Sequence, residues 1–272
     1  MKKKYLALFL AAAMSCSLLA GCGGGTTEPA EEGTEENTEA LVYAVEAGSA
    51  AEAVAAEKGF EYNSVASQGD ALMEVASGTS DAAIIDLLMA GAMIGENTDY
   101  PNLVTGEELT TEEYVVGCRQ DSDLTDYINW VLSVAYADGT MEEIATTYGV
   151  QAALVEQSEV AEPEVVAGGD VAYIQDKGTL VVGITNFEPM DYKEEGSDEW
   201  IGFDADMAKL VAEKLGVEIQ FVEIDWDNKI MELDSKNIDV VWNGMTLTSE
   251  VTAAMNCTNA YCNNAQVVVL PG

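Results

Sequence analysis

The sequence contains no histidine, and its five cysteines form no CxxC pair. Zinc sites in proteins are built mainly from cysteine and histidine, and a Ser-His-Asp triad needs an imidazole. The composition therefore disfavours a zinc site and histidine-dependent catalysis. We expect no metal, no cofactor and no catalytic residue.

Basic residues are also scarce. Lysine and arginine total 11 against 49 acidic residues, which gives a net charge of -38. A field of this sign repels nucleic acid and anionic lipid surfaces, and it keeps a protein soluble outside the cell. We therefore expect no nucleic-acid partner.

The apolar run at the N-terminus is too short for a comfortable membrane span of about 20 residues. It extends from Tyr5 to Ala20, after a basic start, and ends in Leu19-Ala20-Gly21-Cys22. This pattern predicts a lipoprotein signal peptide over residues 1–21 and a lipidated Cys22. The protein would then be extracytoplasmic, anchored to the outer face of the cell membrane. The alternative is an ordinary signal peptide cleaved elsewhere.

The next segment lacks apolar periodicity. Residues 22–40 combine glycine, threonine and six glutamates, which predicts a disordered acidic tether. Three cysteines follow it, at Cys118, Cys257 and Cys262, an odd number for an exported protein. A bridge between Cys257 and Cys262 and buried free thiols are both open, because geometry rather than spacing decides between them.

The remaining chain alternates strands and helices in two blocks, residues 41–150 and 171–272, separated by an acidic linker over 151–170. A chain of 272 residues exceeds what one core usually serves, so two lobes are expected. The alternation favours α/β lobes with parallel sheets. Strands are expected at 41–46, 81–86, 112–119, 179–185, 217–224, 238–244 and 264–272, and helices at 48–59, 69–78, 87–96, 122–149 (broken at Asp138-Gly139), 203–216 and 227–237.

Segments of both blocks resemble a known protein family. The segment GTLVVGITNFEPMDYKEEGSDEWIGFDADMAKLVAEKLGV, with DVVWNGMTLTSE and AYCNNAQVVVL, resembles the first lobe of type 3 extracellular solute-binding proteins of amino-acid ABC importers. VYAVEAGSAAEAV, SGTSDAAIID and the sequence from Leu109 to Val150 resemble the second lobe and closing helices. The two blocks stand in reversed order relative to the family.

The resemblance implies a two-lobed, periplasmic-binding-protein-like (type II) clamp that is circularly permuted. Residues 41–150 would form the second lobe plus closing helices, and residues 171–272 the first lobe. The linker would join the family's original ends, and its 20 residues can span up to roughly 65 Å. A truncated or rearranged gene fragment is the alternative.

The implied function is capture of a small polar solute, an amino acid or related amine, for delivery to an ABC permease. We expect a monomer whose lobes close on the ligand. A ligand-sensing module for a membrane receptor is an alternative. A dehydratase-like enzyme is a further one, since some proteins of this fold resemble dehydratases.

In the second block, the turn Gly48-Ser49-Ala50 opens a helix after a strand. The Ser49 hydroxyl and the amide of Ala50 could hold a carboxylate, or Ser49 could be a plain N-cap. The resemblance favours the ligand. It also implies that Asp86, at the end of its strand, pairs with a ligand ammonium. Glu46 could pair with a cationic side chain, or be a solvated strand end.

In the first block, the resemblance places Phe187 and Trp226 as aromatic walls of the site, although aromatic residues are more often core. Asn243, Gly244 and Thr246 can offer amide, carbonyl and hydroxyl groups. Tyr192 and Trp242 are second-rank candidates.

One position departs from the family pattern. The family's loop usually carries an arginine that binds the ligand carboxylate, and Val251 stands there in GMTLTSEV. The carboxylate would then depend on the Ser49 turn, the Thr246 N–H and Lys229. We therefore expect modest affinity for common α-amino acids, or preference for a cationic or zwitterionic ligand.

Overall fold

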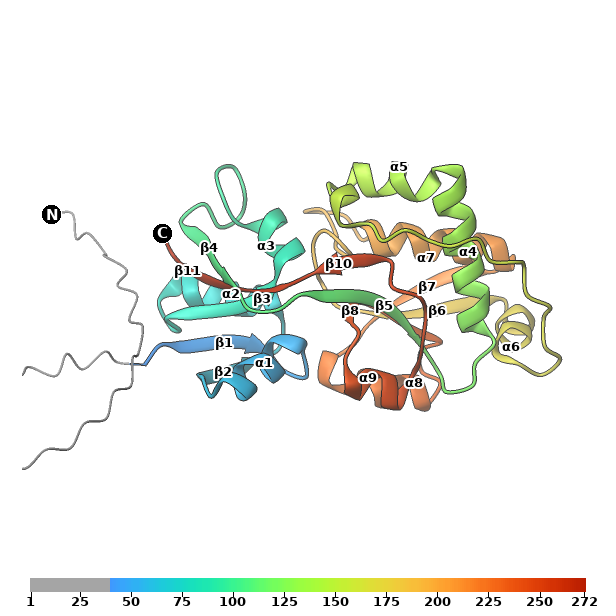
Figure 1. The fold of residues 1–272 in the computed structure, drawn as a ribbon, viewed down its shortest axis with the longest axis horizontal. Coiled ribbons are helices and arrows are strands. Elements are labelled where there is room, and N and C mark those ends of the chain that lie inside the picture. Colours follow the sequence, from blue (N-terminus) through green and yellow to red (C-terminus); the bar gives the residue numbers. More distant parts are fainter. Residues whose placement is uncertain (1–39) are drawn as a thin grey trace, which may run out of the picture. The chain divides into compact units, whose positions relative to one another are not determined.

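The computed structural model describes residues 40–272, which form two α/β lobes (Figure 1). The predicted signal peptide, the lipidated Cys22 and almost all of the predicted tether lie outside the described residues. Within residues 40–272, no helix combines the length and the apolar character that a membrane crossing requires.

The second lobe contains a five-stranded sheet in the order β2-β1-β3-β11-β4. β1 is parallel to β2 and β3, whereas β11 runs antiparallel to β3 and β4. Three helices pack against this sheet. The elements are β1 (Val42–Glu46), α1 (Ala50–Lys58), β2 (Glu61–Val65), α2 (Gln68–Ser77), β3 (Ala82–Asp86), α3 (Leu87–Met93), β4 (Leu103–Glu108) and β11 (Gln266–Pro271).

The first lobe contains the sheet β10-β5-β8-β6-β7, with β9 paired to β5. β6 is parallel to β7 and β8, and β5 runs antiparallel to β8. The elements are β5 (Glu112–Cys118), α4 (Leu124–Asp138), α5 (Thr140–Thr147), η1 (Gln151–Ala153), α6 (Asp170–Lys177), β6 (Thr179–Ile184), α7 (Phe203–Leu215), β7 (Glu218–Glu223), η2 (Trp226–Asn228), α8 (Lys229–Asp234), β8 (Val240–Thr246), α9 (Ser249–Ala254), β9 (Asn256–Cys257) and β10 (Cys262–Asn264).

The chain crosses between the lobes twice, from β4 to β5 and from β10 to β11 (Figure 1). A division by sequence therefore differs from the division in space. Residues 112–150 join the first lobe, and β11 joins the sheet of the second lobe although it ends the other block. Each lobe is built from non-contiguous pieces of chain.

The helix boundaries follow from local chemistry. α1, α2 and α7 each end at a glycine in the left-handed region, at Gly59, Gly78 and Gly216. A glycine adopts this conformation without the steric cost that a Cβ adds. The predictions of these three helices and of the break at Gly139 between α4 and α5 are confirmed.

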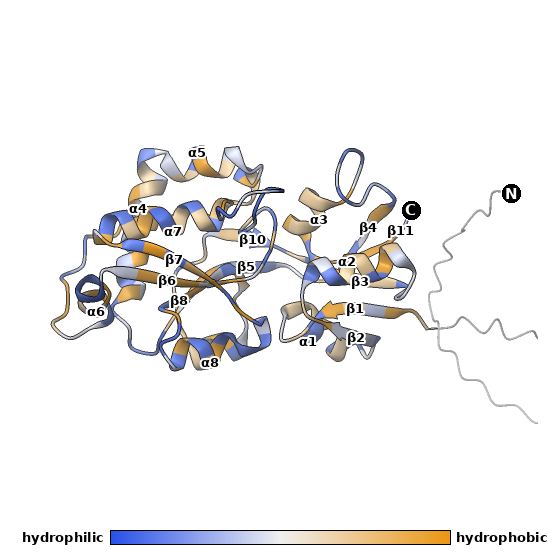
Figure 2. Ribbon diagram, turned by 180° about the vertical axis from the view of Figure 1, so that it is seen from behind, coloured by the Kyte–Doolittle hydropathy of each residue, from blue (hydrophilic) through white to orange (hydrophobic). Residues whose placement is uncertain are grey.

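In the first-lobe sheet, the strand β8 is buried on both faces. Along β8, Val240 and Trp242 belong to one apolar cluster, and Val241 and Met245 to another. Strands covered on both faces are expected to be apolar throughout rather than alternating. Figure 2 shows this for β6, which is largely hydrophobic, whereas the helix α8 carries both hydrophilic and hydrophobic residues.

Three features differ from the sequence-based expectation or decide between its alternatives. The sheets are mixed, not parallel, because both interlobe strands enter them antiparallel. β2, β4, α6, α9 and the short β9 and β10 were not foreseen. Cys118, Cys257 and Cys262 are all free thiols, so no bridge joins the last two.

Candidate ligand-binding site

A pocket lies between the lobes, lined by the carboxyl ends of β1 and β3 and the start of α1 on one side and by η2, β8 and α9 on the other. Its volume of about 160 Å³ is close to the roughly 150 Å³ of an engineered cavity that admits a benzene molecule. The lining residues are Glu46, Gly48, Ser49, Ala50, Ala53, Gln68, Asp86, Trp226, Lys229, Asn243, Gly244, Met245, Thr246, Thr248, Ser249, Glu250 and Val251. Seven of the eight ligand-binding residues proposed from the sequence are among them, all but Phe187.

The turn before α1 is shaped for contact with the first lobe. Gly48 has φ +69°, and a Cβ there would lie 2.7 Å from the Cα of Asp227. The Ser49 side chain accepts a hydrogen bond from the N–H of Glu52 at 3.2 Å, and the Glu52 carboxylate accepts from the N–H of Gly48 at 2.8 Å. Ser49 is therefore the N-cap of α1, and it also lines the pocket.

Asp86 is buried, and side chains from both lobes surround its carboxylate. The Tyr114 hydroxyl donates to Oδ1 at 2.7 Å and the Gln266 amide donates to the same oxygen at 3.0 Å. Asn264 also donates to Oδ1, and Gln68 donates to Oδ2. Burial raises the pKa of Asp86 to about 7, the charge of Glu112 adds to this, and the donated hydrogen bonds act in the opposite direction.

Glu46 ends β1 beside Asp86 and is also buried, with 4% of its surface exposed. Its Oε1 accepts no hydrogen bond from any described residue. Burial raises the pKa of Glu46 to about 8, the Asp86 charge contributes further, and Lys229 and Gln68 oppose the shift. The strand end that could have been solvated is thus an enclosed carboxyl group.

Lys229 approaches the pocket from the first lobe and bridges to the second. Its Nζ donates to the carbonyl of Gly48 at 2.8 Å and to that of Trp226 at 3.2 Å. The same Nζ lies 4.9 Å from the centroid of the Trp226 ring, a cation–π distance. Burial lowers the pKa of Lys229, which nearby carboxylates, Glu250 foremost, counteract.

The polar residues of β8 are largely engaged within the first lobe. Asn243 Oδ1 accepts from the Thr185 N–H at 2.8 Å, and the Gly244 N–H donates to Asp204 at 2.6 Å. The Thr246 hydroxyl donates to Glu112 at 3.0 Å. These residues belong to the strand itself, not to a loop after it.

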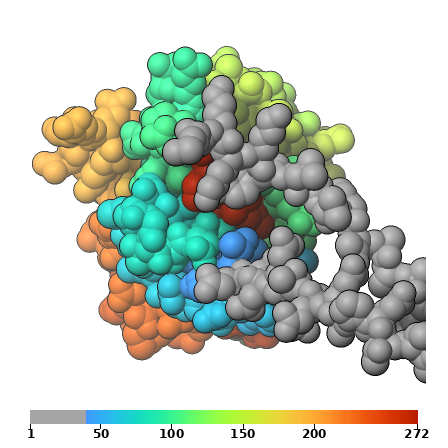
Figure 3. Space-filling view, turned by 90° about the vertical axis from the view of Figure 1, so that its left-hand side faces the viewer, coloured from blue at the N-terminus to red at the C-terminus, as the bar shows by residue number. Residues whose placement is uncertain are grey.

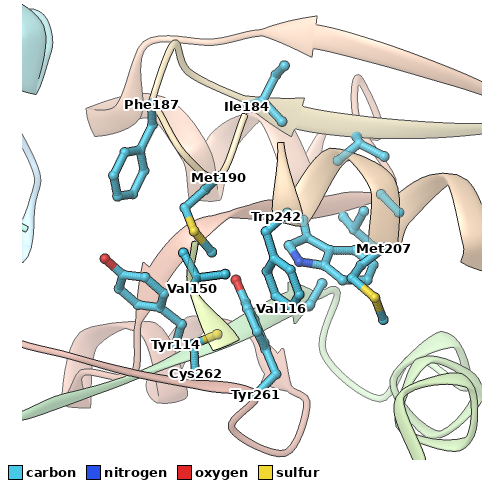
Figure 4. Close-up of a cluster of buried hydrophobic side chains, with 14 of the residues drawn as sticks. Tyr114, Val116, Val150, Ile184, Phe187, Met190, Met207, Trp242, Tyr261 and Cys262 are labelled. Atoms are coloured by element: carbon cyan, nitrogen blue, oxygen red, sulfur yellow. The ribbon is translucent and has the colours of Figure 1, made fainter. Parts of the chain in front are cut away.

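Phe187 does not line the pocket. Its ring packs edge-on against Tyr114 at 6.4 Å, behind Gly244, whose added Cβ would lie 2.5 Å from it. Figure 4 shows Phe187 and Trp242 in the buried cluster with Tyr114 and Tyr261. These aromatic residues have the ordinary core role, while Tyr192 lies at a separate surface hollow.

Several pocket residues were not foreseen from the sequence, above all Gln68 and Glu250. Gln68 begins α2 and both donates to Asp86 and accepts from its N–H at 2.9 Å. Only its place at the start of a helix after a serine cap could have drawn attention to it. Val251, the position of the family arginine, does line the pocket.

Residues 180–272 match the model of the bacterial extracellular solute-binding proteins, family 3. This region belongs to that family. The arginine-binding extracellular protein ArtP of Bacillus subtilis is 34% identical over 94 residues, which cover 34% of this chain and 36% of ArtP. An ancestral cationic amino acid solute-binding protein of known structure is 37% identical, with a TM-score of 0.30, over 30% of this chain and 36% of that one.

A cyclohexadienyl dehydratase of Pseudomonas aeruginosa is also similar, with 33% identity over 79 residues that cover 28% of this chain and 29% of the enzyme. The chain thus matches about a third of the length of each of these relatives. The matched family is made of extracytoplasmic solute-binding proteins, which supports a ligand-binding role for this chain.

Proposed function

We propose that this protein is the substrate-binding component of an ABC importer and that it captures an amino acid or a related amine between its lobes. The observation that carries the proposal is the polar pocket between the carboxyl ends of β1 and β3 and the family-3 region. In α/β proteins, ligands bind at the carboxyl ends of parallel strands. The closed lobes deliver the solute to a permease.

The ligand carboxylate is proposed to rest on the N-terminus of α1, next to Ser49 and Ala50. N–H groups at the start of a helix are unpaired within it and attract anions. Lys229 supplies the positive charge that Val251 cannot, since both line the same pocket. Trp226 forms the apolar wall.

The anchor remains part of the proposal. Lipidation of Cys22 would hold the protein on the outer face of the membrane. Replacing Cys22 with alanine is expected to release the protein into the soluble fraction, as measured by fractionation of cells. Retention of the variant in the membrane fraction would contradict the anchor.

The reversed order of the lobe segments is proposed to be a circular permutation within one clamp. Two facts support it: the lobes have sheets of five and six strands, and β1 and β11 flank the same strand, β3. The rival is a rearranged gene fragment without a functional cleft.

Catalysis of the dehydratase type has one supporting observation, the similarity to the Pseudomonas enzyme. Such chemistry needs a general acid or base in the pocket, and Glu46 and Asp86 are carboxyl groups with pKa values raised to about 8 and about 7. We favour binding because ArtP and the ancestral protein, both binding proteins, are at least as similar to the chain.

One experiment tests the binding proposal. Native mass spectrometry of the purified protein, followed by a thermal-shift screen of amino acids, their amides, polyamines and betaines, should reveal a stabilising ligand. A ligand at 100 times its Kd raises stability by about 2.7 kcal/mol. If no amino acid or amine raises the Tm at millimolar concentration, the proposal is wrong.

A further inference from the structure

Glu46 occupies a position that a ligand can reach and that the protein itself leaves incomplete. It is the last residue of β1, and the last residue of the neighbouring parallel strand β3 is Asp86. Both side chains line the pocket. Two carboxyl groups therefore lie at the same sheet edge, on the same cavity.

The two carboxyl groups differ in their partners. Asp86 accepts hydrogen bonds from four side chains. Glu46, in contrast, has an Oε1 with no donor among residues 40–272. In that part of the chain no lysine or arginine nitrogen lies within 4.0 Å of the Glu46 carboxylate.

Lys229 is the basic side chain of the pocket, but its hydrogen bonds go to groups other than the Glu46 carboxylate. Its Nζ donates to two backbone carbonyls, those of Gly48 and Trp226. The charged lining residues are Glu46, Asp86, Glu250 and Lys229. With its carboxyl groups ionised, the pocket has more negative than positive groups, and a solute with additional positive charge offsets the difference.

An ionised carboxylate that is buried without a partner is expensive, and a cation at hydrogen-bond distance removes most of that cost. A neutral side group of the same shape offers no such compensation, and Glu46 then keeps its proton. We propose that Glu46 is a specificity-determining contact that binds an ammonium or guanidinium group on the solute's side chain. The pocket then selects basic amino acids and diamines over their neutral isosteres. This inference rests on the proposed function.

Proton linkage supports the assignment. The pKa of Glu46 is raised to about 8 by burial, so near pH 7 the group holds a proton in the ligand-free protein. A bound cation lowers this pKa, and the proton leaves as the ligand binds. The charged groups that face Glu46 or share its pocket are Asp70, Asp86, Lys229 and Glu250. The neutral polar side chains are those of Gln68, Ser49, Asn243, Thr246, Thr248 and Ser249.

The test uses two pairs of near-isosteric ligands, arginine with citrulline and lysine with norleucine, measured by titration calorimetry at pH 7.5. The parent protein is expected to bind the cationic member of at least one pair far more tightly. In Glu46→Gln, affinity for the cationic member should fall at least roughly 30-fold. Affinity for the neutral member should change little, so the ratio within the pair approaches one.

Glu57→Gln is the matched control, because it makes the same change of charge at an exposed position on α1 outside the pocket. It should keep the parent's ratio. Repeating the titrations in two buffers of different ionisation enthalpy should show proton release by the parent and less release by Glu46→Gln. Thermal unfolding checks that the variant is folded.

The outcomes separate this inference from the proposed function. If the parent binds a neutral amino acid as tightly as its cationic counterpart, or if Glu46→Gln keeps the same ratio, the role of Glu46 is wrong while solute binding stands. If no amino acid or amine binds the parent, the proposed function fails and the inference fails with it.

Discussion

At the scale of single residues, Asp86 has two tasks. It lines the pocket, where the family resemblance assigns it to the ligand ammonium, and it also accepts hydrogen bonds from Gln68, Tyr114, Asn264 and Gln266. An aspartate that served the ligand alone could be replaced without loss of stability in the empty protein. The network around Asp86 makes that expectation untenable.

Asp86→Asn should therefore weaken both binding and folding. Loss of the charge facing a ligand ammonium costs about 2–5 kcal/mol in binding, or roughly 30-fold or more in affinity. The side-chain N–H₂ that the substitution introduces also faces the neighbouring hydrogen-bond donors, which need an acceptor. This mismatch costs about 1–3 kcal/mol of stability. Calorimetry and thermal unfolding measure the two effects. Asp81→Asn, at an exposed strand start, is the control; unchanged affinity in Asp86→Asn would exclude Asp86 from the site.

The raised pKa values in the pocket predict how stability depends on pH. Glu46 has a folded pKa of about 8 against an ordinary 4.5, and Asp86 about 7 against 3.8. The folded state thus binds these protons more tightly than the unfolded state does. Their contribution is fully present below the ordinary values and is lost as the pH rises toward about 7 and about 8.

The ligand-free protein should accordingly become less stable between pH 5 and pH 8 and change less above that. Glu46→Gln removes one of the titrating groups, so its free energy of unfolding should fall less steeply over this range, by a few kcal/mol at most. Urea unfolding at pH 5, 6, 7, 8 and 9 measures both slopes. Parallel curves for parent and variant would show that Glu46 is not perturbed by burial.

At the scale of elements, the turn between β1 and α1 determines how closely the lobes approach. Gly48 and Gly59 share the same φ of +69°, but only Gly48 has a neighbour, the Asp227 backbone at 2.7 Å from a built Cβ. A side chain at either position costs about 1 kcal/mol of backbone strain. At Gly48 it would in addition push the first lobe away.

Gly48→Ala is therefore expected to lower ligand affinity at least roughly tenfold, equivalent to about 1.4 kcal/mol, because the closed arrangement with the Lys229 bridge is disturbed. Gly59→Ala should lower the Tm by a few degrees and leave the affinity unchanged. The comparison of the two variants by calorimetry and thermal unfolding separates closure from local strain. Equal affinities would mean that the turn does not control closure.

The elements also show what sequence reasoning reaches. Helices with a clear stop, such as α1 at Gly59 and α7 at Gly216, were predicted within a few residues because their end signals are local. β4 was missed because five of its six residues are exposed, so it has no apolar pattern. Its strand character comes from pairing with β11, about 160 residues away in sequence.

The site shows the same division. Ser49, Asp86 and Trp226 line the pocket, and the sequence points to each because it stands next to a recognisable strand end, helix start or family segment. The burial of Glu46 could not be deduced because it depends on how the two lobes pack, and the core position of Phe187 could not because it depends on packing within the first lobe against Tyr114 and Gly244. Tertiary contacts decide whether a polar strand end is solvated or enclosed.

At the scale of the whole molecule, the two chain crossings couple the folding of one lobe to the folding of the other. β5 and β4 are consecutive in sequence but belong to different sheets, as do β10 and β11. All four tryptophans, Trp130, Trp200, Trp226 and Trp242, precede β11 and follow β4, so their fluorescence reports on the first lobe. Far-UV circular dichroism reports on both lobes.

In a chain with the family's segment order, the end of β11 would be joined to the start of β1. The sheet register places these two ends close together. Tyr43 pairs with Ala82 in parallel, and Val269 pairs with Ala83 in antiparallel sense. β1 therefore begins, and β11 ends, at the same edge of the sheet, on either side of β3. Two strand spacings of about 4.8 Å separate them. Figure 3 shows the red end of the chain and the blue β1 near each other on one face of this lobe.

A reordered variant tests the permutation. Residues 169–272 are placed first and joined by a linker of about six glycine and serine residues to residues 41–155, so that the chain is opened in the segment 156–168, which contains no helix or strand. Because about 10 Å must be bridged and each residue spans about 3.3 Å, the linker suffices.

If both segments form one clamp, parent and variant should bind the same ligand with affinities that agree within a few-fold. Tryptophan fluorescence and circular dichroism should then report one coincident unfolding transition, whose Tm the ligand raises. Two separate transitions in the parent, insensitive to any ligand that stabilises the reordered chain, would show that the present order is a rearranged fragment and not a working clamp.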